Sequence, residues 1–155
     1  ADVMILRAAL AAVLLLAAAG GAVFLWPRDA AVRLAPEDAA LVALGRTVYD
    51  THCAHCHGIK LEGQPDWQTR LPNGRLPAPP HDPSGHTWHH PDEVLFAITR
   101  DGLAAVAPPG YESDMPAFKE VLSDREIVAA LSFIKSTWPA DIRRRHDGLN
   151  RPAER

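Results

Sequence analysis

Cysteine is scarce in this chain of 155 residues, and the only two are Cys53 and Cys56. A structural zinc site of the four-cysteine kind would need a second pair at matching spacing, and the sequence has none. A plain disulfide would be an ordinary use of two cysteines in an exported protein. A redox disulfide of the thioredoxin type would need a strand before the pair and a helix after it, and these are not evident. The remaining roles for the two cysteines are therefore a disulfide, a redox pair or the attachment of one prosthetic group.

An excess of basic residues is also missing. The formal net charge is −3, and residues 29–139 hold 15 Asp and Glu against 9 Lys and Arg. Proteins bind nucleic acid largely through Lys and Arg that neutralise phosphates. The charge balance therefore argues against nucleic acid as a partner.

The two cysteines stand in the sequence Cys53-Ala54-His55-Cys56-His57, which has the C-x-x-C-H pattern of c-type haem attachment. One helical turn places both thiols on the same side, where they can form thioethers with the two haem vinyl groups. His57 follows directly and can turn its imidazole onto the iron as the proximal ligand. The motif predicts one covalent haem c at Cys53, Cys56 and His57.

Apolar residues make up 47% of the chain but are concentrated in its first 26 residues. The remainder carries most of the 14 prolines and 10 glycines, so the soluble domain is small and rich in loops. A large flat cofactor at its centre would supply core contacts that its own side chains lack.

The N-terminal region contains 19 consecutive residues without a charge, Ala8 to Trp26. As a helix this stretch would span roughly 28 Å, close to the thickness of the hydrocarbon core of a bilayer. Arg7 before it favours a cytoplasmic N-terminus. We therefore expect residues 1–28 to be a single-pass transmembrane anchor, followed by a linker at residues 29–35. A cleaved signal peptide remains open, because Ala17-Ala18-Ala19 resembles a cleavage site. Either reading exports the haem domain to the periplasmic side of a bacterial inner membrane.

Three helices are expected in the rest of the chain. Pro36 suits the first position of the first helix, and Gly45 within that helix indicates a close crossing with another helix. Pro91 opens a second helix that Gly102 closes. Residues 123–126 form a capping box for the last helix, which Pro139 stops. A short helical turn is expected at residues 117–122, and residues 140–155 read as a polar, Arg-rich tail.

Met115 is the only methionine outside the predicted membrane segment. It lies in a loop, directly before Pro116, where a thioether can reach a haem. A methionine that only fills a gap in the core would be the ordinary alternative. The order of haem motif, long loop, helix, lone Met-Pro and capped terminal helix favours the ligand.

The chain resembles a class I cytochrome c over about residues 36 to 138. The resemblance implies an all-α domain (36–139) in which three to five helices wrap around one covalent haem. It also implies that the first and last helices cross near Gly45 and Phe133, and that Met115 is the distal iron ligand. The matching pieces are Gly45 and Tyr49, Cys53 to Gly58, Met115 to Phe118, and Leu131 to Ile134.

Four histidines surround Trp88: His81, His86, His89 and His90. One hypothesis makes this stretch a wall of the haem pocket, with the indole of Trp88 and the imidazole of His86 hydrogen-bonded to the haem propionates. The other makes the histidines a second site for copper or zinc. The absence of a fixed helical spacing between ligands favours the wall.

These features predict a membrane-tethered one-electron carrier rather than an enzyme. Redox proteins are the expected partners, such as a quinol-oxidising complex, a periplasmic dehydrogenase or a terminal oxidase. A fixed cytochrome c subunit of a membrane oxidoreductase is the alternative. A third possibility is an enzyme or gas sensor in which Met115 leaves the iron.

Overall fold

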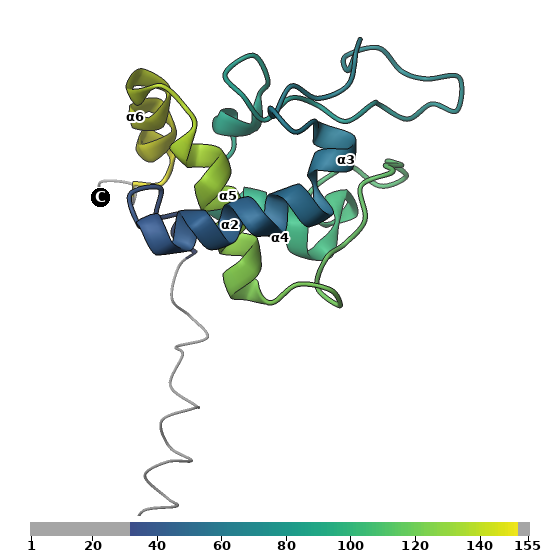
Figure 1. Cartoon of the computed structure of the whole chain (residues 1–155). Helices are drawn as coiled ribbons and strands as arrows, with labels where there is room; N and C mark the ends of the chain where they lie inside the picture. The colour runs from purple at the N-terminus through teal and green to yellow at the C-terminus, as the bar shows by residue number, and fades with distance from the viewer. Residues whose placement is uncertain (1–31, 152–155) are drawn as a thin grey trace, which may run out of the picture. The chain divides into compact units, whose positions relative to one another are not determined.

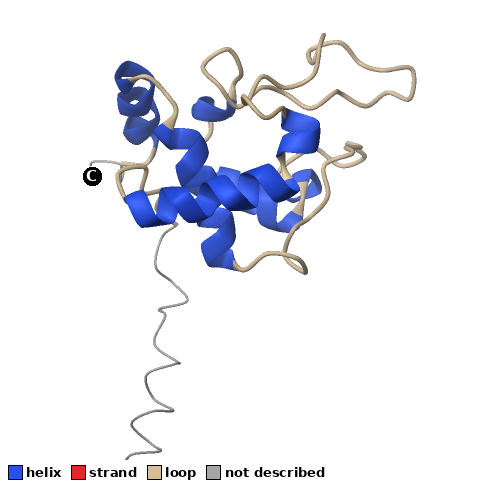
Figure 2. Cartoon of the chain, in the orientation of Figure 1, coloured by secondary structure: helices blue, strands red, loops and turns tan. Residues whose placement is uncertain are grey.

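A computed structural model describes residues 32–151 of the chain. This part is helical and contains no strand (Figures 1 and 2). The predicted membrane segment and the first residues of the predicted linker lie outside it. Among residues 32–151, no helix combines the length and the apolarity needed to cross a membrane. The elements in chain order are α2 (Ala39–His52), α3 (Ala54–His57), η1 (Thr87–His89), α4 (Asp92–Asp101), η2 (Leu103–Ala105), α5 (Asp124–Ser136) and α6 (Ala140–Leu149).

Helix α2 begins later than the sequence predicted. Asp38 is its N-cap, and its carboxylate accepts a hydrogen bond of 3.0 Å from the Leu41 backbone N–H. Pro36 therefore lies in the turn before the helix, where the Asp38 N–H donates to the carbonyl of Ala35. A carboxylate at the N-cap satisfies a free helix N–H, and this fixes the start of α2 better than proline does.

Helices α2 and α5 cross in direct backbone contact (Figure 1). A Cβ placed on Gly45 would lie 1.9 Å from the carbonyl oxygen of Ala129, so only glycine allows this approach. One turn further along, the rings of Tyr49 and Phe133 pack with their centroids 5.5 Å apart. The predicted crossing near Gly45 and Phe133 is confirmed.

The capping box of α5 is also confirmed. The Ser123 hydroxyl accepts from the Glu126 N–H, and the Glu126 carboxylate accepts from the Ser123 N–H at 2.8 Å. The apolar stripe of this helix is buried in the core. Its members are Ile127, Leu131, Ile134 and Trp138.

Residues 117–122 form less helix than predicted. The N–H groups of Val121 and Leu122 both donate to the carbonyl of Phe118, which makes a single turn rather than a helix. The Phe118 N–H donates to Thr99 of α4. This bond ties the turn to α4, and Pro116 just before it prevents helix from extending backwards.

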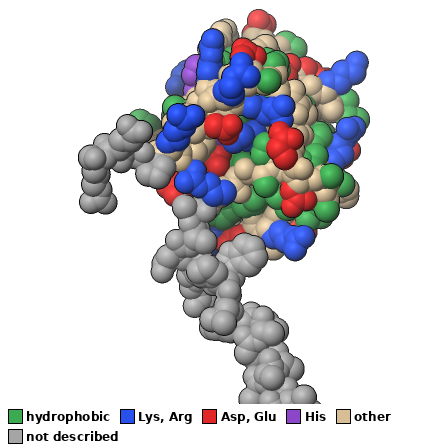
Figure 3. All heavy atoms as spheres, turned by 90° about the vertical axis from the view of Figure 1, so that its left-hand side faces the viewer, with side chains coloured by type: hydrophobic (Ala, Val, Ile, Leu, Met, Phe, Trp, Pro, Cys, Tyr) green, Lys and Arg blue, Asp and Glu red, His purple; other side chains and the backbone are tan. Residues whose placement is uncertain are grey.

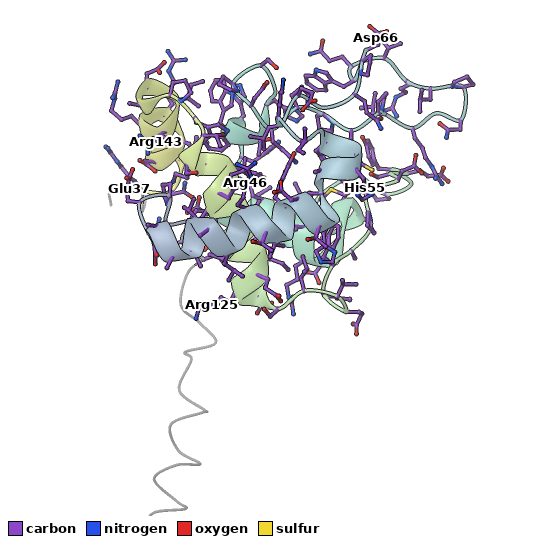
Figure 4. The ribbon with its side chains drawn as sticks, in the orientation of Figure 1. Glu37, Arg46, His55, Asp66, Arg125 and Arg143 are labelled. Atoms are coloured by element: carbon purple, nitrogen blue, oxygen red, sulfur yellow. The ribbon has the colours of Figure 1, made fainter. Side chains whose placement is uncertain are left out.

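The first ten residues of the predicted polar tail form a helix, and the end of the predicted linker contacts the folded domain. Residues 140–149 form α6, whose His146 is fully buried. Arg143 of α6 pairs with Glu37 at 2.6 Å (Figure 4). On the linker side, the Leu34 N–H donates to the buried carboxylate of Asp92. The surface that includes α6 mixes basic and acidic side chains, without a patch of one sign (Figure 3).

Candidate functional site

The two cysteines lie on one turn where α2 passes into α3. Cys53 caps α2 and starts α3, and the N–H groups of Cys56 and His57 donate to its carbonyl at 3.1 and 3.0 Å. Both cysteines are half-buried and unpaired. The turn thus presents two thiols and an imidazole within five residues, as the motif requires.

The environment of Cys53 favours an uncharged thiol. Burial raises its pKa to about 11, with a smaller contribution from the neighbouring Cys56. Redox-active cysteines instead depend on a lowered thiol pKa. The buried environment of Cys53 therefore gives no support to a redox disulfide, and it suits a sulfur atom that ends as a neutral thioether.

His57 is buried and oriented by a carbonyl from a distant loop. Its Nδ1 lies 2.8 Å from the carbonyl oxygen of Pro79, and since a carbonyl can only accept, Nδ1 carries the proton. Burial lowers the pKa of His57, which keeps the ring neutral. In the described part of the chain, Nε2 of this ring makes no hydrogen bond. Its lone pair could therefore bind a metal, in the arrangement usual for metal-binding histidines.

Two further side chains secure this turn. The Tyr49 hydroxyl donates to the carbonyl of Gly58 at 2.8 Å, directly after the motif. His81 stacks on His57, with ring centroids 4.0 Å apart, and its Nδ1 lies 2.8 Å from the Thr87 hydroxyl. In the sequence His81 belongs to the group of histidines around Trp88, but the structure places it against the proposed proximal ligand.

Met115 lies at the edge of the core. It is half-buried and packs against the main hydrophobic cluster. Its N–H donates to the Ser113 hydroxyl at 3.1 Å. Its side chain lines a cavity together with Leu103 and Ala117. A thioether is therefore available from the segment between α4 and α5, and the role of Met115 as the distal iron ligand stays a prediction.

Trp88 and His86 occupy different environments. The indole Nε1 of Trp88 is buried and has no hydrogen-bond partner, so it could donate to a carboxylate of a bound group. His86 is exposed and stacks on Trp67, with centroids 5.4 Å apart. His89 stacks on Trp88 at 3.7 Å.

The histidines do not converge on one point. No group of three or more His, Cys, Asp or Glu residues suited to a metal ion occurs within the described range 32–151. The hypothesis of a second copper or zinc site therefore has no geometric support.

A pair of free cysteines, a neutral imidazole with a free Nε2, and an unpartnered indole donor all suit a haem with its vinyl groups, iron and propionates. A helical domain with this site belongs to the haem proteins that transfer electrons. The family model "Cytochrome c" matches residues 42–138, more than half of the chain, and the chain belongs to the cytochrome c family. Members of this family are electron-transfer proteins that are generally non-catalytic, and the family implies a covalent c-type haem. Searches of curated proteins and of solved structures gave no match.

Proposed function

We propose that this protein is a membrane-tethered, periplasmic one-electron carrier. The haem is attached through Cys53 and Cys56, and its iron is held by His57 and Met115. The observation that carries the proposal is the hydrogen bond from His57 Nδ1 to the Pro79 carbonyl, because it fixes the tautomer that leaves Nε2 for iron. When bound, the haem supplies a reversible one-electron couple.

The residues around the haem have distinct tasks. The Pro79 carbonyl orients the ring of His57, and burial keeps that ring neutral. The sulfur of Met115 supplies a soft distal ligand that favours the ferrous state and so raises the potential. If His57 and Met115 both hold the iron, no position on it would be open to a substrate, and the haem would supply outer-sphere electron transfer only.

Trp88 and His86 are assigned to the propionate side. The buried, unpartnered Nε1 of Trp88 supports a hydrogen bond to a propionate. His86 is exposed and held by its stack on Trp67, so it can reach a propionate only at the rim of the site.

The tether and the partners are inferred from charge and hydropathy. The uncharged stretch Ala8 to Trp26 supports an anchor in the inner membrane, and the acidic balance of residues 29–139 supports a basic docking face on a partner. A quinol-oxidising complex, a dehydrogenase or a terminal oxidase would meet this requirement. Salt should slow the encounter with such a partner.

The test is to produce the full chain together with c-type haem maturation machinery and to record its spectra. We expect one covalent haem and a Met–Fe(III) charge-transfer band that the variant M115A loses. The reduced protein should not bind carbon monoxide at neutral pH. A colourless protein, or a haem with two histidine ligands, would refute the proposal. Extraction in mild detergent should yield a monomer, whereas a stable stoichiometric complex would instead support a fixed oxidoreductase subunit.

A further inference from the structure

The segment before Met115 is held by side chains from the proline-rich loop 64–80. The guanidinium of Arg75 pairs with Glu112 at 3.4 Å and also with Asp114, next to Met115. The guanidinium of Arg70 lies 5.7 Å from the ring centre of Tyr111. Two arginines of one loop thus contact three of the four residues that lead to the methionine.

The segment makes few other hydrogen bonds. From residue 112 to residue 117, no backbone–backbone hydrogen bond occurs within the described part of the chain. The flanking backbone bonds are Tyr111 to Pro108 on one side and Phe118 to Thr99 on the other. Inside this gap the Met115 N–H bonds only locally, to the hydroxyl of Ser113. Contacts from outside the segment must therefore come from side chains, and Arg75 provides two of them.

The loop is built to present Arg75 in a fixed direction. At its tip, the Leu71 N–H donates to the Arg75 carbonyl at 2.9 Å, and the Arg75 N–H donates to the Asn73 side chain at 3.0 Å. Gly74 adopts φ +82°, which closes this tight turn and which other residues rarely adopt. At the base of the loop, Gln64 and Ala78 exchange two hydrogen bonds. Hydrogen bonds within the loop thus fix the backbone of Arg75 independently of its ion pairs with the two carboxylates.

We propose that Arg75 is a positioning residue that keeps the Met115 segment closed over the haem, an inference that rests on the proposed ligation by Met115. Thermal opening of the segment would detach the methionine from the iron and admit an external ligand. The ion pairs are partly exposed, with side-chain exposures of 36% for Arg75, 68% for Glu112 and 59% for Asp114. Exposed pairs are individually weak, so their combined loss should raise the open fraction by about fivefold and leave the global fold intact.

The experiment compares the holoproteins of wild type, R75Q and R143Q. Arg143 is the matched control, because it also pairs with an exposed carboxylate, that of Glu37, but on α6 rather than on the Met115 segment. The rate of imidazole binding to the ferric protein, at imidazole concentrations where the segment closes faster than imidazole binds, is proportional to the open fraction. R75Q should bind about fivefold faster. It should also lose the Met–Fe(III) charge-transfer band at a lower temperature, while R143Q should match wild type in both measurements.

Three further readouts separate positioning from general damage. The variant R75K should bind imidazole at a rate between those of wild type and R75Q. The carboxylate variant E112Q/D114N should bind imidazole as fast as R75Q. Added salt should speed imidazole binding in wild type and leave R75Q nearly unchanged. Equal rates in wild type and R75Q, with the charge-transfer band present in both, would refute the role of Arg75 and leave the ligation by Met115 intact. A wild-type protein without that band would refute both proposals.

Discussion

The crossing of α2 and α5 makes the substitution Gly45→Ala a stringent test of the fold. The added Cβ would lie 1.9 Å from the Ala129 carbonyl oxygen and 2.4 Å from its carbonyl carbon. Real Cβ atoms keep at least 3.0 Å, so the two backbones would have to separate by about 1.1 Å, the difference between those distances. Backbone atoms in two packed helices cannot turn aside as a side chain can.

The expected cost follows from two opposed effects. Overpacking a close contact costs about 1–3 kcal/mol, and here the upper end applies because both partners are backbone. Alanine in a helix interior recovers about 1 kcal/mol relative to glycine. We therefore expect G45A to lower the free energy of unfolding by about 2 kcal/mol, and the melting temperature by about 10 °C.

The assay is denaturant unfolding of the holoprotein, followed by haem absorbance, with Gly148→Ala as the matched control. Gly148 lies in α6, and a Cβ there would meet nothing within 4 Å. G148A should therefore stabilise the protein by up to about 1 kcal/mol through helix propensity alone. The difference between the two variants isolates the contact with Ala129. A G45A protein as stable as G148A would show that the helices do not approach as described.

Three other substitutions test other parts of the structure. Burial, with a contribution from Lys135, lowers the pKa of His146 below its ordinary value of 6.5, so this histidine is neutral when folded and charged when unfolded in acid. The stability that comes from neutral His146 is therefore present above pH 6.5 and is lost as the pH falls towards the folded-state pKa. The variant H146Q should show a flatter dependence of unfolding free energy on pH between about 7 and 5. An unchanged slope would contradict this. Trp88→Phe should shift the midpoint potential while keeping the Met–Fe(III) band, and an unmoved potential would argue against a propionate bond from Nε1. Ser123→Ala should destabilise the protein by about 1 kcal/mol in denaturant unfolding, because it removes the capping box of α5, and no loss would mean that the cap contributes nothing.

The parts of the fold that the sequence predicted depend on short-range chemistry or on a single steric demand. The capping box at Ser123 and Glu126 is complete within four residues. The haem-attachment turn from Cys53 to His57 is complete within five. Gly45 indicated the helix crossing because a glycine inside a helix lowers its stability. Such a residue is therefore expected where another backbone packs too close for a Cβ. Such signals can be recognised without knowing which distant residue they meet.

Helix α6 was missed because its signal is long-range. Its sequence is polar, and the prediction was therefore a polar, Arg-rich tail rather than a helix. The structure instead buries His146, whose Nε2–H donates to the His90 carbonyl at 2.9 Å. Lys135 of α5 is also buried and pairs with Asp147 at 2.6 Å. Buried polar groups that find partners across 12 to 56 residues leave no hydrophobic pattern by which α6 could be predicted.

The site combines features of the cytochrome c family with features particular to this chain. The attachment motif can be recognised in isolation, because the chemistry of thioether formation dictates its spacing. The hydrogen-bond partner of His57 is the backbone carbonyl of Pro79. Every residue has a backbone carbonyl, so the side chain at position 79 could not predict this bond. The attachment of the Met115 segment to Arg75 depends on a loop whose tip turns at Gly74. We therefore expect substitutions in loop 64–80 to change how firmly the distal ligand is held, and substitutions in the motif to decide whether haem is attached at all.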